Sequence, residues 1–302
     1  MNIELSEEAI EFGHQAAKAF EAAGGDELVQ KAQAAPETRA GMITPILDDL
    51  GALELAPRED ADQLEAAAAL CRSAGYWALP YPIAERLSRP SDLDVDGLVV
   101  VANTPQATIG DLPGRWAAVD LNGARSIASP GISRAAFVAD LALETLDDSG
   151  ANDLALALTL PVWTLLGMLD RALDLTIAHV SIRKQFGQTL SGFQSVQFQL
   201  TDGEVERSGL EMLARHTLWS LAVDRADALD DALALRMAAL EAAETVFRVT
   251  HQLHGASGFC DETTLSWLSR YSQPLRRLPL GLSATRELLT QRIGTTGLAT
   301  IS

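Results

Sequence analysis

Residues 154–169 form the longest stretch of the chain without a charged side chain, and they restrict its possible folds more than any other feature. The stretch is 16 residues long and contains Pro161. It is therefore shorter than the roughly 20 apolar residues that a membrane-spanning helix needs. A helix that is apolar on all sides must be covered by neighbouring helices. The stretch predicts a helix buried inside a bundle, and no membrane span.

The rest of the C-terminal half has the pattern of long amphipathic helices. Four are expected, at about 153–183, from the cap Ser191 onward, up to Gly255, and around 282–293. The last two are joined by a connector at 269–279 that contains two prolines. Long antiparallel helices with short joints make a four-helix bundle. The fold class predicted for this half is therefore α.

The first half divides into two parts that differ in composition and in the spacing of their apolar residues. Residues 1–90 are alanine-rich, with Ser6 and two following glutamates as a helix start and Gly51 as a helix stop, which predicts four or five helices. Residues 91–150 contain short β-branched runs separated by Pro, Gly and Asn, which predicts a small sheet of four or five strands. The expected domains are thus 1–90, 91–150 and 151–302.

An excess of acidic side chains excludes several classes of partner. The chain has 41 Asp and Glu residues against 23 Lys and Arg, a formal charge of −18 that repels nucleic acid and anionic membranes. The N-terminus carries acids where a secretory signal would carry basic and apolar residues, which predicts a cytoplasmic protein.

Cys71 and Cys260 are too few for a disulfide framework, and each is expected to be a small buried hydrophobic residue.

Two joints between the expected helices carry residues that suit phosphate binding. The first joint contains Arg183, Phe186 and Gln194, and the second contains Gln252, Gly255 and Gly258. An Arg guanidinium is a planar fork that can bind two phosphate oxygens, and Gly lets backbone N–H groups approach closely. Taken singly, Arg and Gly are ordinary at the ends of helices. Together they predict a site that grips a diphosphate.

This combination resembles the C-terminal domain of the acyl-CoA dehydrogenase family. The family's Arg, aromatic–Gly and Phe–Gln pattern is matched by Arg183, Phe186 with Gly187, and Phe193 with Gln194. Its Gln-x-x-Gly-Gly-x-Gly-Phe segment is matched by Gln252, Gly255, Gly258 and Phe259, and departs at Ala256. The stretches "ILDDLGALELAPRED" and "ALCRSAGYWALPYP" look like the N-terminal domain of the family.

The resemblance implies a mainly α fold with an N-terminal helical domain, a reduced middle β-domain and a C-terminal four-helix bundle. It also implies FAD as the cofactor. In the family, the matched residues hold the ADP half of an FAD whose flavin lies in the neighbouring subunit. The residues given this role in trans are Arg183, Phe186, Gln194, Gln252, Gly255 and Gly258.

The chain departs from the family at the catalytic base. Members abstract the α-proton of an acyl-CoA thioester with a glutamate, which must lie within hydrogen-bond reach of that carbon. Matching without gaps puts Pro279 at the usual position of this base and Ala157 at the position used by a smaller branch. Neither is a carboxylate, so no catalytic residue is assigned. Asp153, about one helical turn from Ala157, is a reserve candidate.

The middle of the chain departs as well, because only "NTPQATIGD" is placed to match the family's flavin-binding segment. The chain therefore lacks the catalytic base and the flavin-binding segment of the family, but it keeps the residues that contact the ADP half of FAD. The resemblance then implies a subunit of an α2β2 acyl-CoA dehydrogenase, as known from actinobacterial steroid and cholesterol degradation. A homologous full-length partner subunit would supply the flavin pocket and the base, with one FAD per heterodimer and a bulky steroid-derived acyl-CoA as substrate.

Two other functions stay open at this point. The chain could be a flavin-free interaction subunit, or a homo-oligomeric flavoenzyme of the same fold with other chemistry, such as a monooxygenase. His251, His254 and Cys260 are close enough in sequence to suggest a metal site, but a fourth ligand is not evident and no metal is expected.

Overall fold

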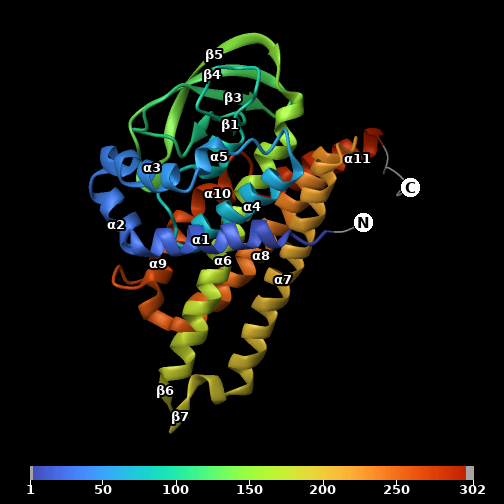
Figure 1. Ribbon diagram of the computed structural model, residues 1–302. Coiled ribbons are helices and arrows are strands. Elements are labelled where there is room, and N and C mark those ends of the chain that lie inside the picture. The colour runs from blue at the N-terminus through green and yellow to red at the C-terminus, as the bar shows by residue number, and fades with distance from the viewer. Residues whose placement is uncertain (1–2, 297–302) are drawn as a thin grey trace.

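The computed structural model describes residues 3–296, and the first part of the chain folds into five helices (Figure 1). They are α1 (Glu7–Ala22), α2 (Glu27–Ala34), α3 (Arg39–Asp49), α4 (Ala61–Tyr76) and α5 (Ile83–Leu87). The Ser6 hydroxyl accepts a hydrogen bond from the Ala9 N–H and caps α1, as its sequence predicts. Gly51 follows α3 with a φ of 63°, the left-handed conformation expected of a helix stop.

A five-stranded sheet follows, with the strand order β1-β3-β4-β5-β2. The strands are β1 (Gly97–Val101), β2 (Gln106–Ala107), β3 (Trp116–Asp120), β4 (Ala124–Pro130) and β5 (Ala139–Ser149). Strands β1 and β3 are parallel, and the other pairs are antiparallel. The turn after β3 closes because the Asp120 carboxylate accepts hydrogen bonds from the N–H groups of Asn122 and Ala124.

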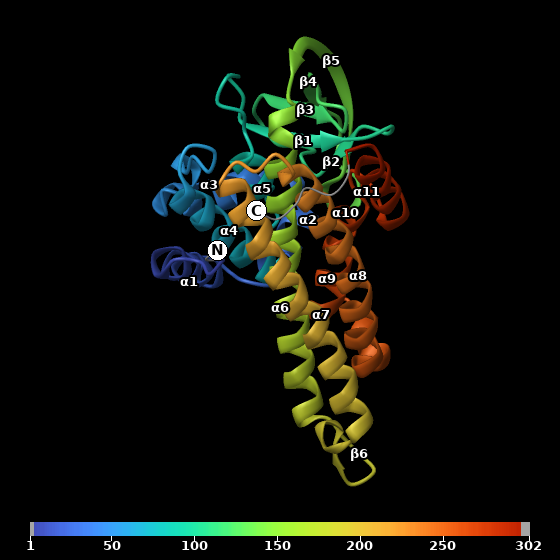
Figure 2. The ribbon, with the colours of Figure 1, turned by 90° about the vertical axis from the view of Figure 1, so that its right-hand side faces the viewer.

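The second half of the chain is dominated by three long antiparallel helices (Figure 2). They are α6 (Leu154–Ile182), α7 (Gln194–Ala222) and α8 (Ala228–His254). The small hairpin of β6 (Lys184–Gln185) and β7 (Gln188–Thr189) joins α6 to α7 at the narrow end of the molecule. The last helix, α11 (Leu282–Thr296), packs against α8 at the opposite, wide end.

The connector between α8 and α11 is helical, which corrects the sequence-based expectation. It contains α9 (Thr264–Tyr271) and α10 (Gln273–Arg277). Pro274 caused the error, because proline usually signals a break. Here it lies in the first turn of α10, where its missing N–H would have no partner in any case. Helix α7 likewise begins at Gln194, and Ser191 lies in the preceding 3-10 turn instead of capping the helix.

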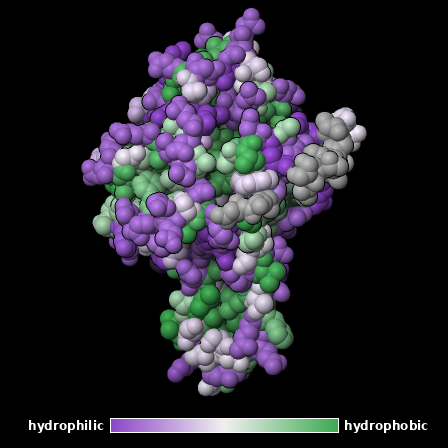
Figure 3. Space-filling view, turned by 45° about the vertical axis from the view of Figure 1, so that its right-hand side comes forward, coloured by the Kyte–Doolittle hydropathy of each residue, from purple (hydrophilic) through white to green (hydrophobic). Residues whose placement is uncertain are grey.

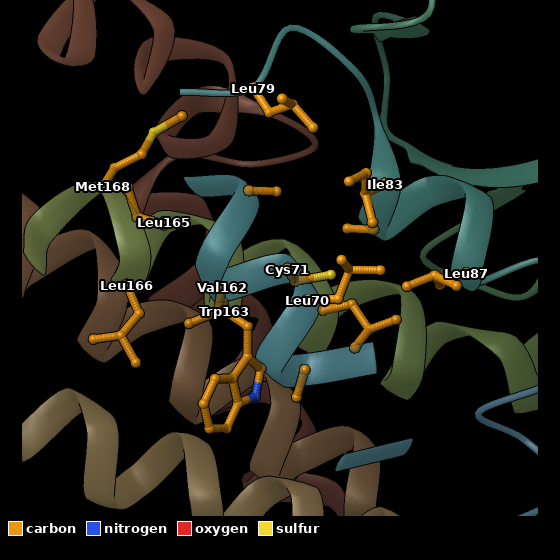
Figure 4. Close-up of a cluster of buried hydrophobic side chains, with 14 of the residues drawn as sticks. Leu70, Cys71, Leu79, Ile83, Leu87, Val162, Trp163, Leu165, Leu166 and Met168 are labelled. Carbon is orange, nitrogen blue, oxygen red and sulfur yellow. The ribbon is translucent and has the colours of Figure 1, made fainter. Parts of the chain in front are cut away.

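The main core forms where α4 crosses α6 (Figure 4). Leu70 and Cys71 of α4 meet Val162, Trp163 and Leu166 of α6, and all five side chains are buried. The crossing is close because glycine lies on each helix. A Cβ atom added at Gly75 would lie 1.8 Å from the Thr164 carbonyl oxygen, and one at Gly167 would lie 1.9 Å from that of Arg72. The two backbones therefore touch directly.

Helix α6 is the buried helix that residues 154–169 predict. The segment 151–182 is, within residues 3–296, long and apolar enough to cross a membrane. However, 83% of its most apolar window is buried against the rest of the protein. It is thus the central core helix of the body, and its last turns extend into the narrow end.

Candidate functional site

The first predicted joint lies at the narrow end of the molecule, where α6 ends. Arg183 leaves the helix with an extended backbone, and the chain then turns back through Phe186 and Gly187, whose φ values are 51° and 84°. The Leu190 N–H donates to the Arg183 carbonyl oxygen and closes the loop. Phe186 is 92% exposed, and its ring centroid lies 6.5 Å from that of Phe193. The loop therefore presents an aromatic edge to solvent.

The second joint ends α8. Gly255 has φ 60° and ψ −143°, a conformation that side-chain-bearing residues avoid, and no atom lies within 4 Å of the position of a Cβ. Gly258 behaves differently because it is buried. A Cβ there would lie 3.0 Å from the Cβ of His254 and 3.2 Å from the Nδ1 of His251. Gly258 therefore serves the packing of the turn against α8, while Gly255 leaves its surface open.

The structure brings the two joints to the same end of the bundle. Val180 of α6, Val196 of α7 and Leu253 of α8 share a small buried cluster, with Phe193 at its edge. The imidazole rings of His179 and His254 stack across α6 and α8, with centroids 4.4 Å apart and planes 19° apart. His179 belongs to none of the sequence motifs. It lies four residues before Arg183, which is one helical turn away.

The polar side chains of both joints are available to a ligand. Arg183, Gln194 and Gln252 are exposed, and within residues 3–296 no hydrogen bond or ion pair engages their side chains. Helix α7 starts at this end without a side-chain cap, so its first N–H groups and its positive dipole end face the same region. A free guanidinium, an uncapped helix start and the open surface at Gly255 fit a diphosphate chemically.

The two family positions for a base, Ala157 and Pro279, line one small cavity far from these joints, in the wide body. Its volume is about 50 Å³. Glu85 is the only carboxylic acid among its described lining residues, and burial raises the pKa of this group. Arg236 closes one wall by donating to the carbonyl oxygens of Leu278, at 2.6 Å, and Leu280, at 2.5 Å.

Asp153 is not free to act on a substrate, which speaks against it as the reserve base. Its carboxylate accepts hydrogen bonds from Nη2 of Arg125 at 2.7 Å and from Nε at 3.1 Å. Its other oxygen pairs with Arg58 at 3.0 Å. The side chain is 5% exposed, so these contacts tie α6 to the sheet through a buried ion cluster. The carboxylate of Asp153 therefore stabilises the fold, and it is not placed to accept a proton from a substrate.

One of the two cysteines differs from the expectation that both are buried. Cys71 is buried in the α4–α6 core, where burial raises the pKa of its thiol, but Cys260 is exposed after the turn that ends α8. Both were expected to be buried, because the sequence does not show that the turn before Cys260 projects into solvent. Across residues 3–296, no group of three or more His, Cys, Asp or Glu side chains is placed to hold a metal ion.

A second, larger cavity of about 650 Å³ opens between the sheet and helices α9 and α10. Its wall contains Trp267 and Tyr271, whose rings stack with centroids 6.0 Å apart. The guanidinium of Arg270 lies 4.3 Å from the centre of the Trp267 ring, and Arg277 lines the same cavity. A planar, negatively charged group would suit these walls.

The fold and the sequence of the C-terminal part are similar to those of acyl-CoA dehydrogenases. Residues 159–281 match the family model of the acyl-CoA dehydrogenase C-terminal domain. The chain is also similar to acyl-CoA dehydrogenase FadE28 of Mycobacterium tuberculosis, with 36% identity over 132 residues. This match covers 43% of the chain and 38% of FadE28, so the chain spans well under half of that relative's length.

Solved structures share the fold over the whole chain. The ChsE4–ChsE5 complex from Mycobacterium tuberculosis matches with a TM-score of 0.78 and 16% identity, covering 99% of this chain and 100% of that one. A variant of the Tcur3481–Tcur3483 steroid ACAD matches with a TM-score of 0.78 and 18% identity, covering 96% and 98%. Identities this low establish the acyl-CoA dehydrogenase-like fold and nothing finer.

Proposed function

We propose that this chain is a subunit of a heteromeric FAD-dependent acyl-CoA dehydrogenase, in which it binds the ADP half of an FAD. A homologous partner subunit supplies the flavin pocket and the base, and FAD, when bound, accepts the hydride of the dehydrogenation. The observation that carries the proposal is the exposed guanidinium of Arg183, which no side chain within residues 3–296 engages, at the same end of the molecule as the uncapped start of α7. In a chain of charge −18, an exposed guanidinium at a helix joint gives a local site where an anion is attracted, although the chain as a whole repels anions.

The roles within the site follow from exposure. Arg183 would hold the diphosphate with its planar fork, and Gln194 and Gln252 would add neutral hydrogen bonds from either side. Phe186 would pack against the adenosine part, because its ring is 92% exposed and lies near the ring of Phe193. Gly255 would leave room for the ligand, and Gly258 would shape the turn that positions it.

The small cavity at Ala157 and Pro279 supports a non-catalytic role for this chain. Its volume of about 50 Å³ is well below the roughly 150 Å³ of a protein cavity that accepts benzene. A bulky acyl group would therefore not fit where Ala157 and Pro279 lie, and its dehydrogenation would have to take place in the partner. A steroid-derived acyl-CoA is the substrate we favour, because one similar structure is a steroid ACAD and another is a two-component complex.

The narrow end also has a surface that suits a partner subunit (Figure 3). Large apolar side chains are exposed on the last turns of α6, the loop after it and the first turns of α7, and they are Ile177, Ile182, Phe186, Phe198 and Val205. Exposed apolar side chains that gather in this way mark interaction surfaces. The clamp and the surface share one end of the molecule, so a partner docked there would bring its cofactor to Arg183.

The proposal is tested by substituting Arg183→Ala in the assembly purified through a tag on this chain. Loss of a charge-assisted hydrogen-bond pair costs about 1.5–3 kcal/mol, so FAD should bind roughly 10-fold to 100-fold more weakly. Lys184→Ala is the matched control, because it removes the neighbouring exposed cation and should leave the flavin content unchanged. Equal flavin content in the Arg183→Ala and Lys184→Ala assemblies would show that the clamp does not exist.

One observation favours a second candidate, a homo-oligomeric flavoenzyme that holds the flavin ring itself. The cavity of about 650 Å³ beside Trp267 and Tyr271 has the size of a ligand site. This candidate predicts that the chain expressed alone is yellow and keeps its flavin through gel filtration. A colourless chain that gains flavin only on mixing with a partner supports the heteromeric proposal instead.

A further inference from the structure

The stacked pair of His179 and His254 has chemistry that the proposed clamp does not yet use. The two rings come from different helices and meet between the two joints. Both side chains are partly exposed, so solvent protons reach them. Imidazole is the side chain whose charge changes most readily near neutral pH.

The hydrogen bonds of His254 fix which of its nitrogens is free. Its Nδ1 lies 2.9 Å from the Thr250 carbonyl oxygen, which can only accept. Nδ1 therefore carries a hydrogen and donates it, and in the neutral ring Nε2 is left as an unprotonated acceptor. Protonation of Nε2 would turn this atom into a second donor without disturbing the bond to Thr250.

Among residues 3–296, the charged or titratable groups that act on the pair are all basic. Arg183 acts on His179 from the end of α6, His251 acts on His254 within α8, and Arg276 acts in turn on His251 from α10. Burial and then Arg183 lower the pKa of His179. Burial, His179 and His251 also lower the pKa of His254, against the opposite effect of its bond to Thr250. Without an anion, the lowered pKa of each ring favours its neutral form.

We propose that the His179–His254 pair is a conditional cation, which takes up one solvent proton when a diphosphate binds beside Arg183 and releases it when the diphosphate leaves. A diphosphate diester carries about two negative charges, and Arg183 alone supplies one positive charge. The stacked histidines supply a second positive charge when one of them is protonated. Keeping that charge absent in the free protein avoids repulsion with Arg183. This inference rests on the proposed function and adds an electrostatic role for two residues to which the matched motifs assign none.

The sign of the pH dependence follows directly. Anion binding raises the pKa of the pair relative to the free protein, so the affinity for the anion is highest at low pH. It falls as the pH rises through the pKa of the bound state. One linked proton limits the slope to about tenfold in Kd per pH unit. Arg183 stays charged throughout, so it contributes no slope over this range.

The test measures proton uptake when FAD binds to the flavin-depleted assembly. Titration calorimetry in buffers of different ionisation enthalpy gives the number of protons taken up, and FAD has no group that titrates near neutral pH. The wild-type assembly should take up a substantial fraction of one proton at pH 7. The double variant His179→Phe/His254→Phe keeps two stacked rings and should take up none. His14→Gln, an exposed histidine on α1, is the matched control and should behave as wild type.

The outcomes separate this inference from the proposed function. Wild-type uptake that persists unchanged in the double variant would overturn the role of the pair, while the Arg183 clamp would stand on its own test. FAD that binds equally well to the Arg183→Ala assembly would overturn both. If the double variant is unstable, the single variant His179→Phe on the exposed side of the stack must show reduced uptake, and unreduced uptake there refutes the inference.

Discussion

Substituting glycine by alanine at two helical positions should have opposite effects, because only one of the glycines lies in a helix crossing. Gly167 lies in α6 where it meets α4, and Gly209 lies in α7 with open space around it. Alanine is the better helix former by about 1 kcal/mol, so Gly209→Ala should stabilise the protein by about that amount. Any difference at Gly167 must come from packing.

The magnitude at Gly167 follows from the contact distances. A Cβ there would lie 1.9 Å from the Arg72 carbonyl oxygen, where ordinary contact begins at 3.4 Å. The helices would have to separate by about 1.5 Å, and both contacting atoms belong to backbones that cannot rotate away. Overpacking of this kind costs about 1–3 kcal/mol or more. A clash between two rigid helices belongs at the upper end of this range, so after subtracting the gain of about 1 kcal/mol in helix propensity, Gly167→Ala should still lower the free energy of unfolding by about 2 kcal/mol.

Urea denaturation followed by circular dichroism measures both variants against wild type. The expected midpoints lie on opposite sides of the wild-type midpoint. A Gly167→Ala variant as stable as Gly209→Ala would refute the direct backbone contact between α4 and α6. It would also remove the reason given for the position of α6, on which the narrow end and its clamp depend.

Two further variants test buried charge. Arg236→Met should lower the free energy of unfolding by about 2 kcal/mol or more, because the carbonyl oxygens of Leu278 and Leu280 lose their donor, and denaturation with urea would show it. Glu211→Gln tests a carboxylate whose pKa burial alone would raise, but which hydrogen bonds from three arginines hold at about 2. Its stabilisation, on the order of 3 kcal/mol, is present above pH 4.5 and lost as the pH falls toward 2. The variant should therefore be less stable at pH 7, with a difference that shrinks in acid; a difference that is constant with pH contradicts this.

The helices of this fold were predictable because their signals are local. Residues 154–169 have no charge to place in water, so they had to form the core helix α6. Gly51 and Gly255 marked helix ends because positive φ favours glycine. Helices α9 and α10 were missed, since the start of α10 at Pro274 depends on neighbours that the sequence pattern does not show.

The candidate site was only partly predictable, because its geometry depends on contacts between distant segments. Arg183 and Gly255 were found through their motifs, and their roles stay predictions. The stack of His179 on His254 joins residues 75 positions apart, which no local pattern reveals. The burial of Gly258 and the pairing of Asp153 with two arginines depend on tertiary contacts in the same way.

The central claim is that Arg183 binds a diphosphate whose flavin belongs to another chain. An experimental structure of the FAD-loaded assembly measures this most directly, through the distance from the Arg183 guanidinium to the nearest diphosphate oxygen. The account predicts a distance of about 2.7–2.9 Å, with the flavin ring in the partner subunit. A guanidinium that faces bulk water, or a flavin ring bound in the cavity beside Trp267, would contradict it.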